Sequence, residues 1–169
     1  GTACPMNAVR TLRFDCPLGP LGAVASDQGL QWLHFDPKPL PADTATPDSP
    51  AAAHLARLQA ELSAYFAGRL TRFTVPLAAR GSAFQLQVWS RLHEIPFGDT
   101  RTYGELAHQL GQPGAARAVG LANGQNPIAI LCPCHRVISP GGKLTGYAGG
   151  LARKRALLEL EGALQPSLF

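Results

Sequence analysis

The chain has 169 residues, of which 46% are hydrophobic and 15% charged, the balance of a globular protein. No apolar run approaches the roughly 18 residues that a membrane-spanning helix needs. No basic segment followed by an apolar core marks a secretion signal, so we expect a cytoplasmic protein. Four cysteines, Cys4, Cys16, Cys132 and Cys134, are too few for a disulfide scaffold, and a reducing compartment would keep them as free thiols.

The net charge of +4 comes mostly from the second half of the chain. Residues 1–81 hold seven Lys and Arg against six Asp and Glu, whereas residues 82–169 hold eight against five. So small an excess is equally compatible with an ordinary surface and with a face that binds nucleic acid.

The first part of the chain alternates between β-forming residues and turns. Residues 1–5 carry no pattern and are given no role. Between Val9 and Phe35, two runs of β-formers flank a predicted turn at residues 17–22, and residues 31–35 form a further strand. Residues 37–50 hold five prolines and are expected to be a surface loop.

A helix and one more strand complete this first domain. Residues 51–67 have the pattern of an amphipathic helix that ends at Gly68, and residues 72–77 are predicted to be a strand. Residues 79–82 have the composition of a linker. We therefore predict one domain over residues 1–81 and a second over residues 82–169.

The second domain begins with helical patterns. Helices are predicted over residues 84–93, 102–110 and 115–122, with a Gly-Pro-containing turn at 111–114 between the last two. This is the outline of a helix-turn-helix, although an ordinary helical hairpin has the same sequence pattern.

A candidate nucleophile follows these helices. Residues 128–131 form an apolar, strand-like run, and Pro133 prevents helix beyond it, so Cys134 is expected at an abrupt turn that faces a cavity. A thiol becomes a strong nucleophile when a nearby base or positive charge stabilises its thiolate. His135 is a candidate base and Arg136 a positive charge. The alternative is a buried, inert cysteine.

The histidine would need an acidic partner to act as a base. Neighbouring side chains in an extended chain point to opposite sides, so His135 is expected to reach Cys134 only through a water molecule or a turn. Glu161 lies on the apolar face of a predicted helix over residues 151–161, where a buried partner such as His135 would explain a carboxylate. The alternative is a solvated helix end paired with a basic side chain.

The third predicted helix carries alanine and glycine with a single arginine, Arg117. Small residues suit a tight and weakly selective fit to DNA, even in the minor groove, where Arg117 would enter the base stack. Alternatively, Arg117 binds a phosphate or a nearby acid and the alanines pack against another helix.

Several motifs together resemble one family. Pro133-Cys134-His135-Arg136-Val137, Asn126-Pro127 and Gly146-Tyr147-Ala148-Gly149-Gly150-Leu151 closely resemble the O6-alkylguanine-DNA alkyltransferases, and the similarity runs from about Phe84 to Glu161. The resemblance implies a mixed α/β fold. A small ribonuclease-H-like antiparallel sheet with a helix would precede a helical, winged-helix-like domain that binds DNA and accepts the alkyl group.

The resemblance also implies roles for individual residues. Cys134 would accept the alkyl group, His135 would be its base through water, Glu161 would orient His135, and Asn126 would support the turn. Tyr103 would help rotate the damaged nucleotide and protonate the departing guanine, while Arg117 fills the vacated place. The DNA-contacting residues would be Thr102, Tyr103, Ala116, Arg117, Ala118, Gly120 and Asn123, and the pocket residues Val137, Tyr147, Ala148 and Gly149.

The expected function is direct reversal of DNA damage. The protein would move the alkyl group of O6-alkylguanine, and of O4-alkylthymine, from double-stranded DNA to its own Cys134, once per molecule. It would act as a monomer without cofactor, membrane or obligate protein partner, and without metal, since Cys4, Cys16 and His34 match no zinc spacing. The alternatives are a non-catalytic module that binds alkylated bases and a cysteine hydrolase. Cys132 is assigned to core packing.

Overall fold

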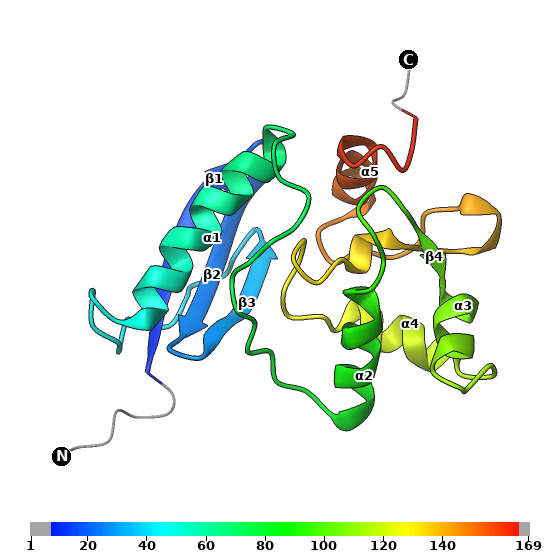
Figure 1. Ribbon diagram of the computed structural model, residues 1–169, viewed down its shortest axis with the longest axis horizontal. Coiled ribbons are helices and arrows are strands. Elements are labelled where there is room, and N and C mark those ends of the chain that lie inside the picture. The colour runs from blue at the N-terminus through cyan, green and yellow to red at the C-terminus, as the bar shows by residue number, and fades with distance from the viewer. Residues whose placement is uncertain (1–7, 166–169) are drawn as a thin grey trace. The chain divides into compact units, whose positions relative to one another are not determined.

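The computed structural model describes residues 8–165, and these form two compact units that divide between Arg80 and Gly81. Residues 1–5 and Cys4 lie outside the described residues. Each unit has its own secondary structure (Figure 1).

The N-terminal unit contains a three-stranded antiparallel sheet in the order β1-β2-β3, formed by β1 (Val9–Cys16), β2 (Gly19–Ser26) and β3 (Gly29–Phe35). The predicted turn at residues 17–22 is too long, because Gly19 already pairs with Cys16. Gly19 has a φ of 123°, which lets two residues, Pro17 and Leu18, reverse the chain.

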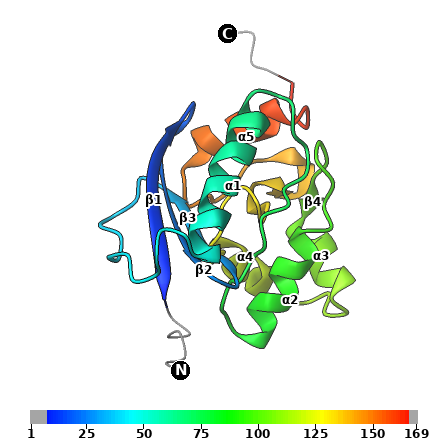
Figure 2. The ribbon, with the colours of Figure 1, turned by 60° about the vertical axis from the view of Figure 1, so that its left-hand side comes forward.

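Helix α1 (Pro50–Phe66) lies across one face of this sheet (Figures 1 and 2). The Ser49 side chain accepts a hydrogen bond from the Ala52 amide at 3.2 Å, and Pro50 occupies the first turn, so the helix start is well capped. Its buried residues recur every three or four positions and pack with the sheet residues Leu21, Leu30 and Leu33: Ala51, Leu55, Leu58, Leu62 and Tyr65.

The strand predicted at residues 72–77 is wrong. Only a single bridge forms there, between Leu30 and Leu77. The Thr74 amide donates instead to the Glu61 carboxylate of α1 at 2.9 Å, so a side chain takes the place of a neighbouring strand.

The C-terminal unit is mostly helical. Its elements are α2 (Ala83–Leu92), β4 (Arg101–Thr102), α3 (Tyr103–Gln109), α4 (Ala116–Gly124), β5 (Val137–Ile138), α5 (Leu151–Leu160) and two short 3-10 helices, η1 (Cys134–Arg136) and η2 (Pro140–Gly142). Ser82 and Thr102 begin α2 and α3 with reciprocal capping boxes. Strands β4 and β5 pair in parallel, which joins the start of α3 to the residues that follow η1.

The apolar run at residues 128–131 is buried as expected but is not a strand. Ile130 has a φ of 68°, and the Leu131 amide donates to the Ala129 carbonyl at 2.7 Å, so the chain turns repeatedly here. Four consecutive apolar residues correctly predicted that this segment is buried, but burial does not by itself determine an extended conformation.

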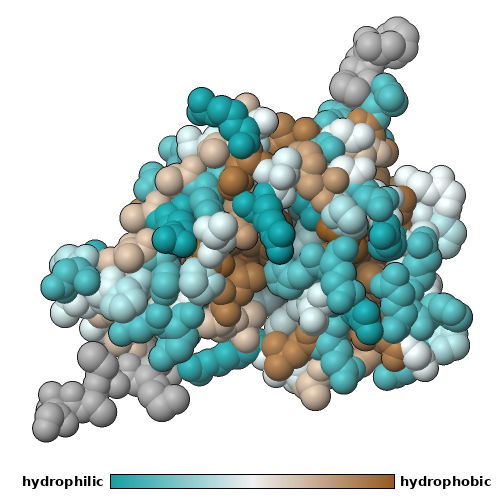
Figure 3. Space-filling model, in the orientation of Figure 1, coloured by the Kyte–Doolittle hydropathy of each residue, from teal (hydrophilic) through white to brown (hydrophobic). Residues whose placement is uncertain are grey.

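The predicted fold class, a small antiparallel sheet with a helix followed by a helical domain, is confirmed. No helix among residues 8–165 is long and apolar enough to cross a membrane. On the face drawn in Figure 3, hydrophobic and hydrophilic residues are intermixed.

Gly29 generates a prediction about the stability of the N-terminal unit. Its φ is 151°, and a Cβ placed on it would lie 2.5 Å from the Pro76 carbonyl oxygen. We expect Gly29→Ala to lower the free energy of unfolding by about 2 kcal/mol, measured by urea denaturation. Gly104→Ala is the control, because its added Cβ meets nothing closer than 3.9 Å. Equal stabilities for the two variants would contradict the expectation.

Candidate active site

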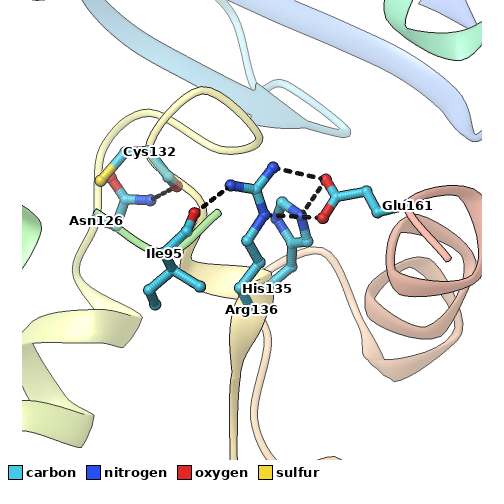
Figure 4. Close-up of polar contacts among 6 residues, drawn as sticks. All are labelled: Ile95, Asn126, Cys132, His135, Arg136 and Glu161. Atoms are coloured by element: carbon cyan, nitrogen blue, oxygen red, sulfur yellow. Dashed lines mark hydrogen bonds and ion pairs between the residues drawn. The ribbon is translucent and has the colours of Figure 1, made fainter. Parts of the chain in front are cut away.

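The turn that carries Cys134 is held by Asn126, which is 4% exposed. The Asn126 side-chain amide donates to the Cys132 carbonyl at 2.8 Å (Figure 4) and to the Ile128 carbonyl at 3.0 Å, and its oxygen accepts from the Ile128 amide at 3.0 Å. Pro133 then bends the chain so that the Cys134 amide reaches the Cys132 carbonyl at 2.7 Å. The thiol therefore lies at the first residue of η1, on a turn that is held by both side-chain and backbone hydrogen bonds.

A buried carboxylate, Glu161 at the end of α5, meets both residues that follow the thiol (Figure 4). Its oxygens lie 2.8 Å from His135 Nε2, 2.8 Å from Arg136 Nε and 3.0 Å from Arg136 Nη2. Arg136 Nη1 also donates to the Ile95 carbonyl at 2.7 Å. Arg136, predicted as a positive charge beside the thiol, is thus bound to Glu161 instead.

This arrangement determines the protonation of the histidine. Burial alone would raise the pKa of Glu161, but the hydrogen bonds from His135 and Arg136 outweigh it and lower the pKa to about 2. Burial lowers the pKa of His135 despite the opposing effect of Glu161, so the imidazole is neutral near pH 7. An ionised carboxylate only accepts hydrogen bonds, so the proton is on Nε2 and Nδ1 has a lone pair. Nδ1 is buried and has no partner among residues 8–165.

Lys154 is the cation whose charge lowers the pKa of the Cys134 thiol. It was not predicted as a site residue from the sequence. Its ammonium is fully buried and donates to the carbonyls of Val137 at 2.6 Å, Thr145 at 2.8 Å and Gly146 at 3.3 Å. Burial lowers the pKa of Lys154 to about 8, against the opposing effect of Cys134. Burial raises the pKa of the Cys134 thiol, and the nearby Asn126 amide and Lys154 charge offset this only in part.

A signal for Lys154 was nevertheless present in the sequence. Lys154 lies seven residues before Glu161, which places both on the face of α5 that buries Leu157 and Leu158. The same reasoning that singled out Glu161 applies to this lysine.

The predicted pocket residues lie after β5. Val137 is buried, and its carbonyl accepts the Lys154 bond described above. Ala148 is exposed and Gly149 is half-buried, within a turn closed by the Gly150 amide and the Tyr147 carbonyl at 2.9 Å. The Tyr147 hydroxyl is buried without a partner among the described residues, and burial, with the charge of Cys134, raises the pKa of this phenol well above its usual value.

The residues predicted to contact DNA divide into two groups. Arg117 and Ala118 are exposed on α4, and Arg117 makes no hydrogen bond or ion pair with any residue of the described chain. Ala116 and Gly120 are half-buried. Asn123 was predicted to contact DNA, but it is only 5% exposed. Its side-chain amide instead donates to the Cys134 carbonyl at 3.4 Å, in the interior of the unit. Residues 119, 122 and 123 form the inward face of the helix.

Tyr103 and Thr102 stand where β4 meets α3. The Tyr103 hydroxyl donates to the Thr145 carbonyl at 3.3 Å, and its ring lies against Gly120, where an added Cβ would be 3.6 Å away. The Thr102 hydroxyl accepts from the Glu105 amide at 3.1 Å and caps α3. No group of three His, Cys, Asp or Glu side chains suited to a metal ion occurs within residues 8–165.

Comparison with known proteins assigns both units. The ribonuclease-like domain of 6-O-methylguanine DNA methyltransferase matches residues 10–79, and the DNA binding domain of the same enzyme matches residues 83–163. The chain belongs to this family. The resemblance inferred from the motifs around Cys134 is therefore confirmed.

Individual members of the family are similar over nearly their whole length. A methylated-DNA–protein-cysteine methyltransferase of Mycobacterium tuberculosis is 51% identical over 159 residues, covering 91% of this chain and 93% of the relative. A protein of the same name from Methanosarcina acetivorans is 49% identical over 152 residues, covering 89% and 96%. The crystal structure of Mycobacterium tuberculosis OGT in complex with DNA superimposes with a TM-score of 0.79 at 52% identity, covering 90% and 92%.

The lowered pKa of Glu161 predicts how stability depends on pH. A carboxyl group with a pKa of about 2 in the folded protein and 4.5 unfolded stabilises the fold above pH 4.5 and loses that contribution as the pH falls towards 2. We expect the wild-type protein to lose about 3 kcal/mol of unfolding free energy over this interval through Glu161 alone, a loss absent from Glu161→Gln.

The measurement is urea denaturation at a series of pH values. The lowered pKa of His135 acts in the same direction, below pH 6.5, and Glu161→Gln removes the opposing effect of the carboxylate, so this contribution is not smaller in the variant than in the wild type. Glu159→Gln is the matched control, since Glu159 lies in the same helix and its carboxylate forms an ion pair with Arg155 at 3.8 Å. If the unfolding free energy fell equally steeply below pH 4.5 in the wild type and in Glu161→Gln, the hydrogen bonds of Glu161 would not account for the loss of stability in acid.

Proposed function

We propose that this protein repairs O6-alkylguanine in double-stranded DNA by moving the alkyl group onto the sulfur of Cys134, once per molecule. The observation that carries the proposal is the thiol on a rigid turn next to an imidazole whose Nδ1 has an unpartnered lone pair and whose Nε2 proton is bound by Glu161. The names of the relatives, and the complex of one of them with DNA, support the same activity.

The first step is removal of the thiol proton. Burial keeps Cys134 protonated in the resting protein, so the proton passes to His135 Nδ1, directly or through a water molecule, as the alkyl carbon approaches. This converts a neutral pair into a thiolate and an imidazolium. Glu161 stabilises the imidazolium, and the Lys154 charge stabilises the thiolate.

The second step is displacement at the alkyl carbon. A bond forms between Cys134 Sγ and that carbon while the bond from the carbon to guanine O6 breaks, and the electron pair remains on the base. The Tyr103 hydroxyl, whose contacts with the Thr145 carbonyl at 3.3 Å and the Thr145 hydroxyl at 3.5 Å are both long, supplies the proton that restores neutral guanine. The product is S-alkylcysteine, a thioether that water does not cleave, so the protein acts once and needs no cofactor. O4-alkylthymine presents an equivalent ether and is a second substrate.

The reacting oxygen imposes a requirement on DNA binding. O6 of guanine lies on the paired edge of a stacked base, so the nucleotide must leave the helix before sulfur can approach. In this proposal the vacated position is filled by Arg117, an exposed residue without a partner in the described chain. The protein acts on the duplex as a monomer.

The first prediction concerns stoichiometry. Incubation with duplex DNA containing O6-methylguanine should add the mass of one methyl group per protein and then stop, because the thioether is stable. Intact-protein mass spectrometry measures the increase, and peptide mapping should place it on Cys134 and not on Cys132. Cys134→Ala should gain no mass, and Cys16→Ala should gain as much as the wild type. Continued turnover, or no added mass, would refute the proposal.

The second prediction separates extrusion from chemistry. Arg117→Ala should slow repair of O6-methylguanine in duplex DNA by about a hundredfold while the reaction with free O6-benzylguanine keeps its rate, because a free base needs no extrusion. Rapid-quench measurements on both substrates test this. Equal slowing on both would show that Arg117 supports the site itself.

A further inference from the structure

One large apolar side chain on the DNA-binding domain has no structural purpose within the fold. Four large hydrophobic residues are exposed within residues 8–165, and Leu121 is the most exposed of them at 65%. It lies on α4, one turn after Arg117. A single exposed leucine is common on protein surfaces, so exposure alone carries no conclusion.

The position of Leu121 on the helix is what distinguishes it. The exposed residues of α4, Arg117, Ala118, Leu121 and Gly124, recur every three or four positions and so form one outward face. The inward face carries Asn123, whose amide donates to the Cys134 carbonyl. Leu121 is therefore at the centre of the outward face of a helix whose other side contacts the acceptor turn.

The composition of this outward face selects an occupant. Arg117 is a cation without a partner in the described chain, which suits the phosphates of DNA. The remaining residues are Ala118, Leu121 and Gly124, none of which can hydrogen-bond to a base edge through its side chain. A major-groove reader would need such groups, whereas the minor groove is about 6 Å wide and admits small residues and apolar wedges.

We propose that Leu121 is a further DNA-contacting residue, which inserts into the minor groove beside the extruded nucleotide and packs against deoxyribose and base edges. The inference rests on the proposed function and adds a specific division of roles on α4. Arg117 fills the vacated base position, and Leu121 keeps the groove open one helical turn away. Its contribution is apolar, so it strengthens binding without dependence on salt and without selecting a sequence.

The test compares Leu121→Ala with Leu86→Ala, a matched control on α2 that is 44% exposed. Single-turnover kinetics on an O6-methylguanine duplex give the dissociation constant and the rate of transfer. We expect Leu121→Ala to weaken duplex binding about tenfold, since three carbons lose their contacts, and Leu86→Ala to leave it unchanged. The rate with free O6-benzylguanine should be the same in all three proteins.

Salt dependence separates the two residues of the face. In a plot of the logarithm of the association constant against the logarithm of the salt concentration, Arg117→Ala should reduce the magnitude of the slope by about one. Leu121→Ala should leave this slope unaltered. A bulky N2-alkylguanine next to the lesion blocks the minor groove and should weaken binding of the wild type more than that of Leu121→Ala, which has already lost the contact of the leucine. A C5-alkynyl pyrimidine at the same place blocks the major groove and should affect neither.

Several results would overturn the proposal. These are unchanged duplex binding by Leu121→Ala, an equal loss with the free base, sensitivity to the major-groove block alone, or a wild-type dimer that Leu121→Ala dissociates in sedimentation. Failure of the proposed function is a different result, since the wild type would then gain neither a methyl group from the duplex nor a benzyl group from the free base. Because an exposed leucine contributes little to the fold, Leu121→Ala is expected to fold normally.

Discussion

The C-terminal unit depends on one buried carboxylate. Glu161 is 4% exposed, and a lone charge at that depth would cost several kcal/mol. His135 and Arg136 make it tolerable, and Arg136 extends the network to the Ile95 carbonyl after α2. Three segments distant in sequence are thereby joined around η1. The same carboxylate determines the tautomer of His135, so the fold and the proposed chemistry share one interaction.

Lys154 and Glu161 occupy one face of α5 with opposite charges and complementary tasks. Glu161 binds the two residues after the thiol, and Lys154 donates hydrogen bonds to carbonyls of β5 and of the loop before Tyr147. Helix α5 therefore positions both sides of the site. The buried thiol remains protonated until a substrate is present, which also protects it, because the thiolate is the form that oxidants attack.

The sequence could predict features that depend on local pattern. Helix limits agreed within a few residues, and Glu161 stood out because an acid on an apolar face needs a partner. Features that depend on which distant segments contact one another could not be predicted from the sequence. Arg136 is near the thiol in sequence but binds Glu161, and the chain turns over residues 128–131 where Asn126 bonds the backbone of Ile128 before the turn and of Cys132 after it. Asn123 faces inward because the orientation of α4 is set by packing against α2, where Trp89 donates to the Ala122 carbonyl at 2.9 Å.

That orientation of α4 links recognition to chemistry. Its outward face with Arg117 and its inward face with Asn123 are separated by one helix diameter, about 10 Å. Asn123 contacts the carbonyl of the acceptor, and Gly120 contacts the ring of Tyr103. A duplex seated on the outward face would therefore have its position fixed relative to both the sulfur and the phenol. Small side chains suit this arrangement because a Cβ at position 120 would already be in van der Waals contact with the Tyr103 ring, at 3.6 Å, so a side chain longer than alanine would press against that ring.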